Sequence, residues 1–153
     1  MKKQLRLLFV LVAANFFIFS SCHKSDSTPP PAPKTKTQLI TQGTWKFKSA
    51  TVGGSPYTFP SCQTDNILSF GTAGSGTGTV DEGVTKCNAG DPQINNFTWV
   101  FQNNETEILL STPLFTNGSN TVTVISLTET ELVLSMPVST PGPVLIVQVT
   151  FQH

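Results

Sequence analysis

The residues best suited to covalent, redox or metal chemistry are few: three cysteines and two histidines in 153 residues. Histidine is the commonest general base, cysteine is a strong nucleophile, and both bind zinc when they cluster at close spacing. His23 and His153 stand in segments that are not expected to be held by a packed core, and no such cluster occurs. We therefore expect a protein that is not an enzyme, without catalytic residues, metal or cofactor.

Two other segments could suggest a ligand site and are better explained as turns. Asp81 and Glu82 are adjacent, which places them on opposite faces of a strand, and we interpret them as a solvated turn. The glycine-rich stretch 71–83 lacks the Gly-Lys-Ser/Thr ending of a phosphate-binding loop and does not lead into a helix. Glycines at the turns of a β domain explain it without a nucleotide.

The first 21 residues have the order of an export signal. Lys2, Lys3 and Arg6 precede an apolar run of 13 residues at 7–19, and two small serines follow. A helix that spans a membrane needs about 20 apolar residues, so this run is too short to remain as an ordinary anchor.

The motif "FSSC" at 19–22 resembles a bacterial lipobox, in which diacylglycerol is attached to the cysteine before cleavage makes it the N-terminus. Residues 22–37 are polar and rich in proline, as expected of a disordered tether. We expect an acylated Cys22 to anchor the chain at the bacterial envelope, because buried acyl chains supply about 0.8 kcal/mol per methylene. His23 follows where an aspartate often signals inner-membrane retention, which favours the outer membrane. The alternative is ordinary secretion, with Cys22 incidental.

Export implies an oxidising compartment, in which cysteines usually pair. If Cys22 carries lipid, the remaining pair is Cys62–Cys87, and one intramolecular disulfide is predicted. It would stabilise the fold by about 3.5 kcal/mol on the chain-entropy model. The midpoint of the pair falls between residues 74 and 75, so a hairpin there would bring both cysteines together, in a register that pairs Val80 with Ser69.

The charge of the mature chain argues against a nucleic-acid partner. Beyond residue 21 it has six lysines, no arginine and nine acidic residues, a formal net charge of −3. Binding nucleic acid requires clustered positive charge. Residues 38–153 amount to about 115 residues, enough for one domain with a modest core, and we expect a monomer.

Apolar and polar residues alternate with a period of two along most of 38–153, as in strands with one face inward. Trp45 and Phe47 share one face, as do Phe97, Trp99 and Phe101. Only 35–42 suggests a helical turn. Eight strands are predicted, and nine if the second divides, at 44–52, 57–60 running into 66–71, 76–82, 96–102, 106–111, 120–127, 131–137 and 144–152.

Short connections between these runs, such as Asn103–Asn104 and Thr128–Glu129, fit hairpins in an antiparallel meander. An open meander leaves two unpaired edges, and closure into a barrel removes them. The expected fold is all-β: a single antiparallel up-and-down β-barrel of about eight strands with a short N-terminal helical turn. A two-sheet sandwich is the alternative.

The segment "LITQGTWKFKSA" resembles the opening of lipocalins, with a helical turn and then Gly43-x-Trp45 at the first strand. Cys62 before "NILSF", Cys87 after the third strand, "FTWVF" and "LTETELVL" extend this similarity to the lipocalin-like domain of small bacterial lipoproteins. The resemblance implies a barrel whose closed end is plugged by Trp45, with an apolar ligand in the cup. Lipocalins usually stack a late arginine on this tryptophan. The only arginine here is Arg6, so the closed end must be packed differently.

The large inward side chains could line such a cup or simply fill the barrel, and filling is the commoner use of any single one. We predict a membrane-anchored, lipocalin-like lipoprotein that binds a small hydrophobic or amphipathic ligand without catalysis. The alternative is an envelope interaction or adhesion module with a filled barrel, which binds protein or glycan through loops or an outer face. The candidate ligand-binding residues are Phe47, Phe70, Phe97, Trp99, Phe101, Leu134, Val147 and Val149.

Overall fold

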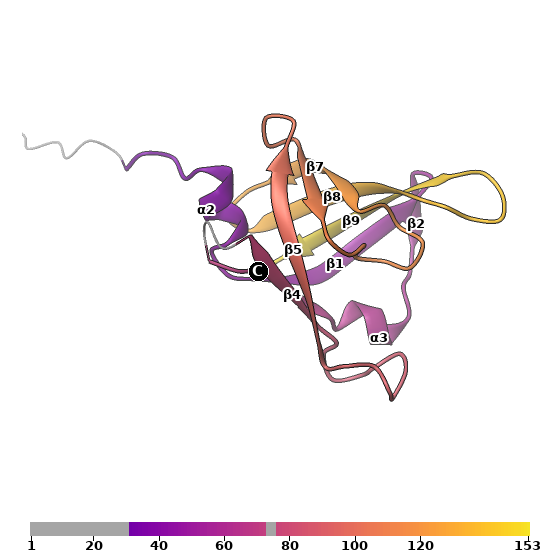
Figure 1. Ribbon diagram of the computed structural model, residues 1–153. Helices are drawn as coiled ribbons and strands as arrows, with labels where there is room; N and C mark the ends of the chain where they lie inside the picture. The colour runs from indigo at the N-terminus through magenta and orange to yellow at the C-terminus, as the bar shows by residue number, and fades with distance from the viewer. Residues whose placement is uncertain (1–30, 73–75) are drawn as a thin grey trace, which may run out of the picture. The chain divides into compact units, whose positions relative to one another are not determined.

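The strands form one antiparallel sheet that closes on itself (Figure 1) in this computed structural model, which describes residues 31–72 and 76–153. The strand order is β2-β1-β3-β4-β5-β6-β7-β8-β9, and β1 also pairs with β9. An eight-stranded up-and-down barrel therefore forms, which confirms the predicted fold. The strands are β1 Thr44–Val52, β2 Ser55–Tyr57, β3 Ile67–Phe70, β4 Thr77–Asp81, β5 Ile94–Gln102, β6 Glu107–Leu110, β7 Thr121–Leu127, β8 Glu131–Val138 and β9 Leu145–Gln152.

The predicted signal peptide at 1–21, Cys22 and most of the tether lie outside the described residues. Within the described part, no helix has both the length and the apolar character needed to cross a membrane. The segment Pro33–His153 is one unit with its own core and disulfide, as expected of a domain that folds alone.

The second predicted strand is divided in two. β2 ends at Tyr57, and the short helix α3 (Ser61–Thr64) separates it from β3. Pro60 stands at the N-cap of α3. Proline has no N–H that would lack a partner there, so it suits the start of a helix. β2 pairs with the last residues of β1 and is an addition to the eight strands of the barrel.

β3 and β4 form the hairpin predicted around residue 74, but the predicted pairing of Val80 with Ser69 is wrong. Val80 pairs with Leu68. Cys62 lies in α3 and Cys87 in the loop after β4, so both are outside the ladder and their midpoint does not fix its register. The disulfide itself is confirmed, with an S–S distance of 2.00 Å and Cα atoms 5.0 Å apart.

The end of the barrel at which β1 begins is closed by a helix. The helix α2 (Lys36–Ile40) starts at a capping box made by Thr35 and Gln38, two residues before the predicted domain boundary at 38. Ile40 is fully buried, and its carbonyl oxygen accepts a hydrogen bond of 2.9 Å from Nε1 of Trp45. Trp45 is also fully buried, so it plugs this end as the resemblance implied.

His153 takes the place at which lipocalins usually carry arginine. Its ring stacks on Trp45 with centroids 3.9 Å apart and planes inclined by 29°. Nδ1 lies 2.7 Å from the carbonyl oxygen of Thr44, and Nε2 lies 3.0 Å from Nε2 of Gln42. The tautomer with its proton on Nδ1 satisfies both contacts, because Nδ1 then donates and Nε2 accepts. The expectation that the fold does not hold His153 is wrong, because β9 runs antiparallel beside β1 and delivers it to Trp45.

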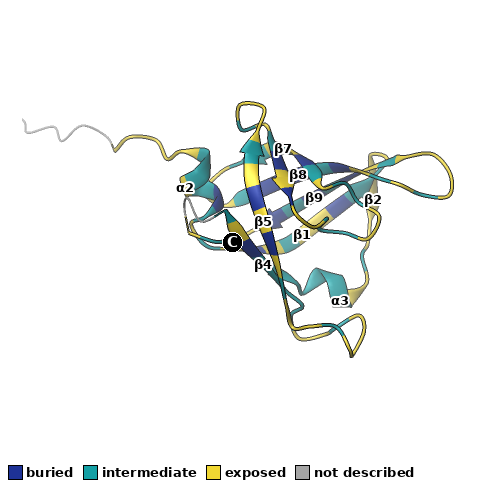
Figure 2. Ribbon diagram, in the orientation of Figure 1, coloured by how far each residue is buried: buried dark blue, intermediate teal, exposed yellow. Residues whose placement is uncertain are grey.

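The interior near the closed end is filled by aromatic rings. Phe70 meets Phe97 and Trp99 edge to face, with centroids 5.7 and 5.3 Å apart. Gly78 pairs with Phe97, and a Cβ at that glycine would lie 2.3 Å from Phe97 Cζ, so the ring occupies the space a side chain would need. Figure 2 shows buried and exposed positions alternating along β5, as the period-two pattern predicts.

Candidate ligand cavity

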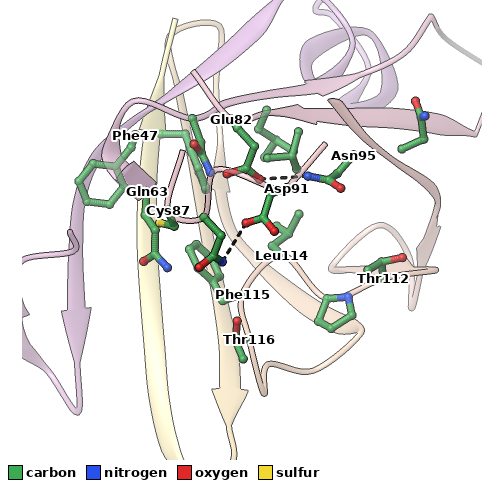
Figure 3. A pocket seen from close by; sticks show the side chains of 17 residues that line it. Phe47, Gln63, Glu82, Cys87, Asp91, Asn95, Thr112, Leu114, Phe115 and Thr116 are labelled. Carbon is green, nitrogen blue, oxygen red and sulfur yellow. Dashed lines mark hydrogen bonds between the residues drawn. The ribbon is translucent and has the colours of Figure 1, made fainter. Parts of the chain in front are cut away.

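A cavity of about 580 Å³ opens at the end of the barrel opposite α2. Figure 3 shows the side chains that line it. Three segments at that end contribute to it: α3, the loop between β4 and β5, and the loop between β6 and β7. Inward residues of β1, β3, β4, β5 and β9 complete the walls. The lining residues are Phe47, Gln63, Asn66, Leu68, Val80, Glu82, Cys87, Asn88, Asp91, Asn95, Asn96, Thr112, Pro113, Leu114, Phe115, Thr116 and Phe151.

The deeper wall of the cavity is apolar. Phe47, Leu68, Val80 and Phe151 reach it from four strands, and Leu68 pairs with Val80. Phe47 and Phe151 are partners in the ladder between β1 and β9. These side chains give a ligand an apolar surface continuous with the filled core.

Aromatic contacts hold the loop between β6 and β7 over the mouth. Phe115 stacks on Phe59, with centroids 5.2 Å apart and planes inclined by 8°. Phe59 also meets Phe47 edge to face at 5.7 Å. Phe59 therefore links the loop to the barrel wall, so that Leu114 and Phe115 form an apolar rim.

The part of the wall formed by the loop between β4 and β5 and by the start of β5 is polar. Glu82 Oε1 accepts a hydrogen bond of 3.0 Å from Nδ2 of Asn95, and Asp91 Oδ2 accepts one of 3.0 Å from Nδ2 of Asn88 (Figure 3). Lys86 Nζ donates to the carbonyl oxygen of Asp91 at 2.7 Å and so fixes the loop that carries it. The cavity thus combines an apolar depth with a hydrogen-bonding mouth.

Of the eight predicted ligand-binding residues, Phe47 lines this cavity and the other seven do not. Phe70, Phe97 and Trp99 fill the closed half, and Phe101 lies edge to face against Trp99. That any of the seven contacts a ligand stays a prediction. The remaining three, which are buried in the core, are Leu134, Val147 and Val149.

Sequence reasoning missed the residues of the mouth. Glu82 was expected in a solvated turn, but it is half-buried, lines the cavity and bonds to Asn95. Asn95 lies two residues before the buried Phe97 in β5 and therefore faces inward as Phe97 does. Leu114 and Phe115 lie between polar neighbours in a loop, and such bulky apolar residues in a turn segment were a usable sign of contact with the barrel.

Within residues 31–72 and 76–153, no three His, Cys, Asp or Glu side chains gather closely enough to hold a metal ion.

A family model described as a lipocalin-like domain matches residues 41–134. The chain belongs to this lipocalin-like family. The match begins before β1, ends within β8, and includes the disulfide and every cavity-lining residue except Phe151.

Lipocalin-like barrels are generally binding folds rather than enzymes, and the family suggests binding of a small hydrophobic ligand. A comparison with curated proteins found no match.

Proposed function

We propose that this lipocalin-like protein binds a small apolar or amphipathic molecule in the cavity at the open end, without chemical turnover. The observation that carries the proposal is a cavity of about 580 Å³ with an apolar depth formed by Phe47, Leu68 and Phe151. Pockets for small molecules usually measure about 300–1,000 Å³ and have mainly apolar walls with a few polar groups. The apolar part of a ligand would pack in the depth, and its polar part would lie at the mouth.

A cavity-filling substitution tests this site directly. Val80→Phe places a ring inside the cavity, whereas Val100→Phe adds the same volume to the outer face of β5, where Val100 is 52% exposed. The uncharged dye N-phenyl-1-naphthylamine is titrated into the wild type and both variants while its fluorescence is followed. We expect Val80→Phe to weaken dye binding at least tenfold and Val100→Phe to leave it unchanged. Equal binding by all three proteins would remove the cavity as the site.

The natural ligand is sought by native mass spectrometry of protein purified gently from its own host. A small molecule that co-purifies with the wild type and not with the Val80→Phe variant would be the natural ligand. Protein that is ligand-free in every preparation, together with no dye binding, would end the proposal.

We further propose that diacylglycerol on Cys22 holds the binding domain at the bacterial outer membrane. The support is the lipobox-like "FSSC" and the proline-rich residues that follow it. Wild-type protein should sediment with membranes, and Cys22→Ser should not be acylated. Recovery of the wild type in the soluble fraction with an unmodified N-terminal Cys22 would reject the anchor and leave the cavity proposal untouched.

The second candidate function, an interaction module, has one observation in its favour. Val100 and Leu109 pair across β5 and β6 on the outer face, where they are 52% and 37% exposed. If this pair contacts a partner, Val100→Thr/Leu109→Thr should abolish the interaction and leave dye binding intact.

A further inference from the structure

The charged groups that line the cavity are all acidic. Glu82 and Asp91 are the two carboxylates among its 17 lining residues, and none of the 17 is lysine, arginine or histidine. Both belong to the loop between β4 and β5: Glu82 directly follows β4, and Asp91 lies shortly before β5. Both are half-buried at the mouth of the cavity, whose deeper wall is apolar.

Within residues 31–72 and 76–153, neither carboxylate forms an ion pair. Their hydrogen-bond donors, Asn95 and Asn88, are uncharged amides, and each occupies one oxygen only. Within the described part of the chain, the second oxygen of each carboxylate accepts no hydrogen bond, and the ion pairs are Lys34–Glu129 and Lys48–Glu131. The ammonium of Lys86 bonds to a main-chain oxygen and is not within ion-pair distance of either carboxylate.

An unpaired carboxylate beside an apolar wall attracts a cation more strongly than the same group in open water, because the local dielectric is lower. Both kinds of head group lose hydration at the mouth, but the carboxylates attract a cation and repel an anion, so that only the cation's loss is offset. Such a mouth would favour an apolar molecule whose polar end is cationic over one whose polar end is anionic.

We propose that the ligand is a cationic amphipath, with a protonated amine or quaternary ammonium head group at Glu82 and Asp91 and an apolar body against Phe47, Leu68 and Phe151. This inference rests on the proposed binding function and adds the ligand class. The free carboxylate oxygens accept hydrogen bonds from an amine, or lie beside a quaternary ammonium, while the two asparagines hold the carboxylates in place.

The test compares three twelve-carbon ligands that differ only in head group: dodecylamine, dodecanol and dodecanoate. Each displaces N-phenyl-1-naphthylamine from the folded unit Pro33–His153 at pH 7 and low ionic strength, below micelle formation. We expect dodecylamine to bind at least tenfold more tightly than dodecanoate, with dodecanol between them. Raising the salt concentration should narrow this affinity ratio in the wild type, because salt screens the partly solvated carboxylates at the mouth.

Glu82→Gln/Asp91→Asn should reduce the amine-to-acid ratio at least fivefold and leave the dodecanol affinity within about twofold, as isosteric neutral groups replace the charges. The matched control, Glu129→Gln/Glu131→Gln, removes the same charge near the closed end and should keep the ratio. If the double variant does not fold, the ligand class is tested by the amine-to-acid affinity ratio of Asp91→Asn alone and by the salt dependence of that ratio in the wild type.

Tighter binding of dodecanoate or dodecanol than of dodecylamine would overturn the ligand class, and so would a ratio that the double variant leaves unchanged. In those cases the binding function stands. Failure of the dye and of all three ligands to bind would overturn both the ligand class and the binding function.

Discussion

The contact between His153 and Trp45 makes a testable contribution to the stability of the closed end. A stacked aromatic pair contributes about 0.5–1.5 kcal/mol beyond the area it buries. The two hydrogen bonds of the imidazole are partly solvated, and each contributes at most about 0.5 kcal/mol. His153→Ala should therefore lower the free energy of unfolding by about 2 kcal/mol, or the Tm by about 8 °C for a domain of this size.

Urea denaturation at pH 7, followed by tryptophan fluorescence and circular dichroism, measures this loss. His153→Phe retains a ring over Trp45 but loses both hydrogen bonds, so it should lose about half as much stability. Gln152→Ala is the control, because Gln152 is the exposed neighbour at the end of β9. It should change stability by less than about 0.5 kcal/mol.

Gly43 provides an independent check on the same contact. A Cβ at Gly43 would lie 3.2 Å from Cε1 of His153, so the ring that stacks on Trp45 would have to shift slightly. Gly43→Ala should then destabilise the wild type and have a smaller effect in the His153→Ala background, a coupling that a double-mutant cycle detects. The stack does not stabilise the closed end if His153→Ala lowers the free energy of unfolding no more than Gln152→Ala does, and if Gly43→Ala lowers it equally in both backgrounds.

Two further predictions concern the interior and the disulfide. Gly78→Ala puts a methyl group where the ring of Phe97 lies and should destabilise by about 2–3 kcal/mol in urea denaturation. Gly90→Ala, which meets no atom within 4 Å, should be close to neutral, and equal effects would contradict the packing argument. Cys62→Ser/Cys87→Ser should cost about 3.5 kcal/mol. Dithiothreitol should lower the Tm of the wild type and not that of the double variant, and a wild type insensitive to reduction would refute the estimate.

The barrel could be predicted because side-chain alternation is a local property. In β1 and β5, large apolar residues occupy alternate positions, which face the interior. Three of them, Trp45, Phe97 and Trp99, are buried as this pattern requires. Closure followed from the cost of unpaired edges. The shift in the hairpin register could not be predicted, because it depends on Cys62 lying in α3 rather than in β3.

The cavity was harder to predict because much of its mouth comes from loops, which have no period. Phe115 reaches it through a stack on Phe59, a contact between segments 56 residues apart in sequence. The position of His153 depended on how far β9 continues beside β1. In both cases the deciding contact is tertiary, and local pattern does not determine it.

The alternation also indicates where the filled interior gives way to the cavity. Along β4 and beyond it the inward residues are Gly78, Val80 and then Glu82, and along β5 they are Asn95, Phe97 and Trp99. Gly78 pairs with Phe97 in the filled half, whereas Val80 pairs with Asn95 beside the cavity. An inward carboxylate or amide in a dry core would cost several kcal/mol. The hydrogen bond between Asn95 and Glu82 uses only one carboxylate oxygen and leaves the charge unpaired, so these residues can face inward only where water or a ligand's polar group reaches them. Polar residues at inward strand positions therefore mark the start of the binding space.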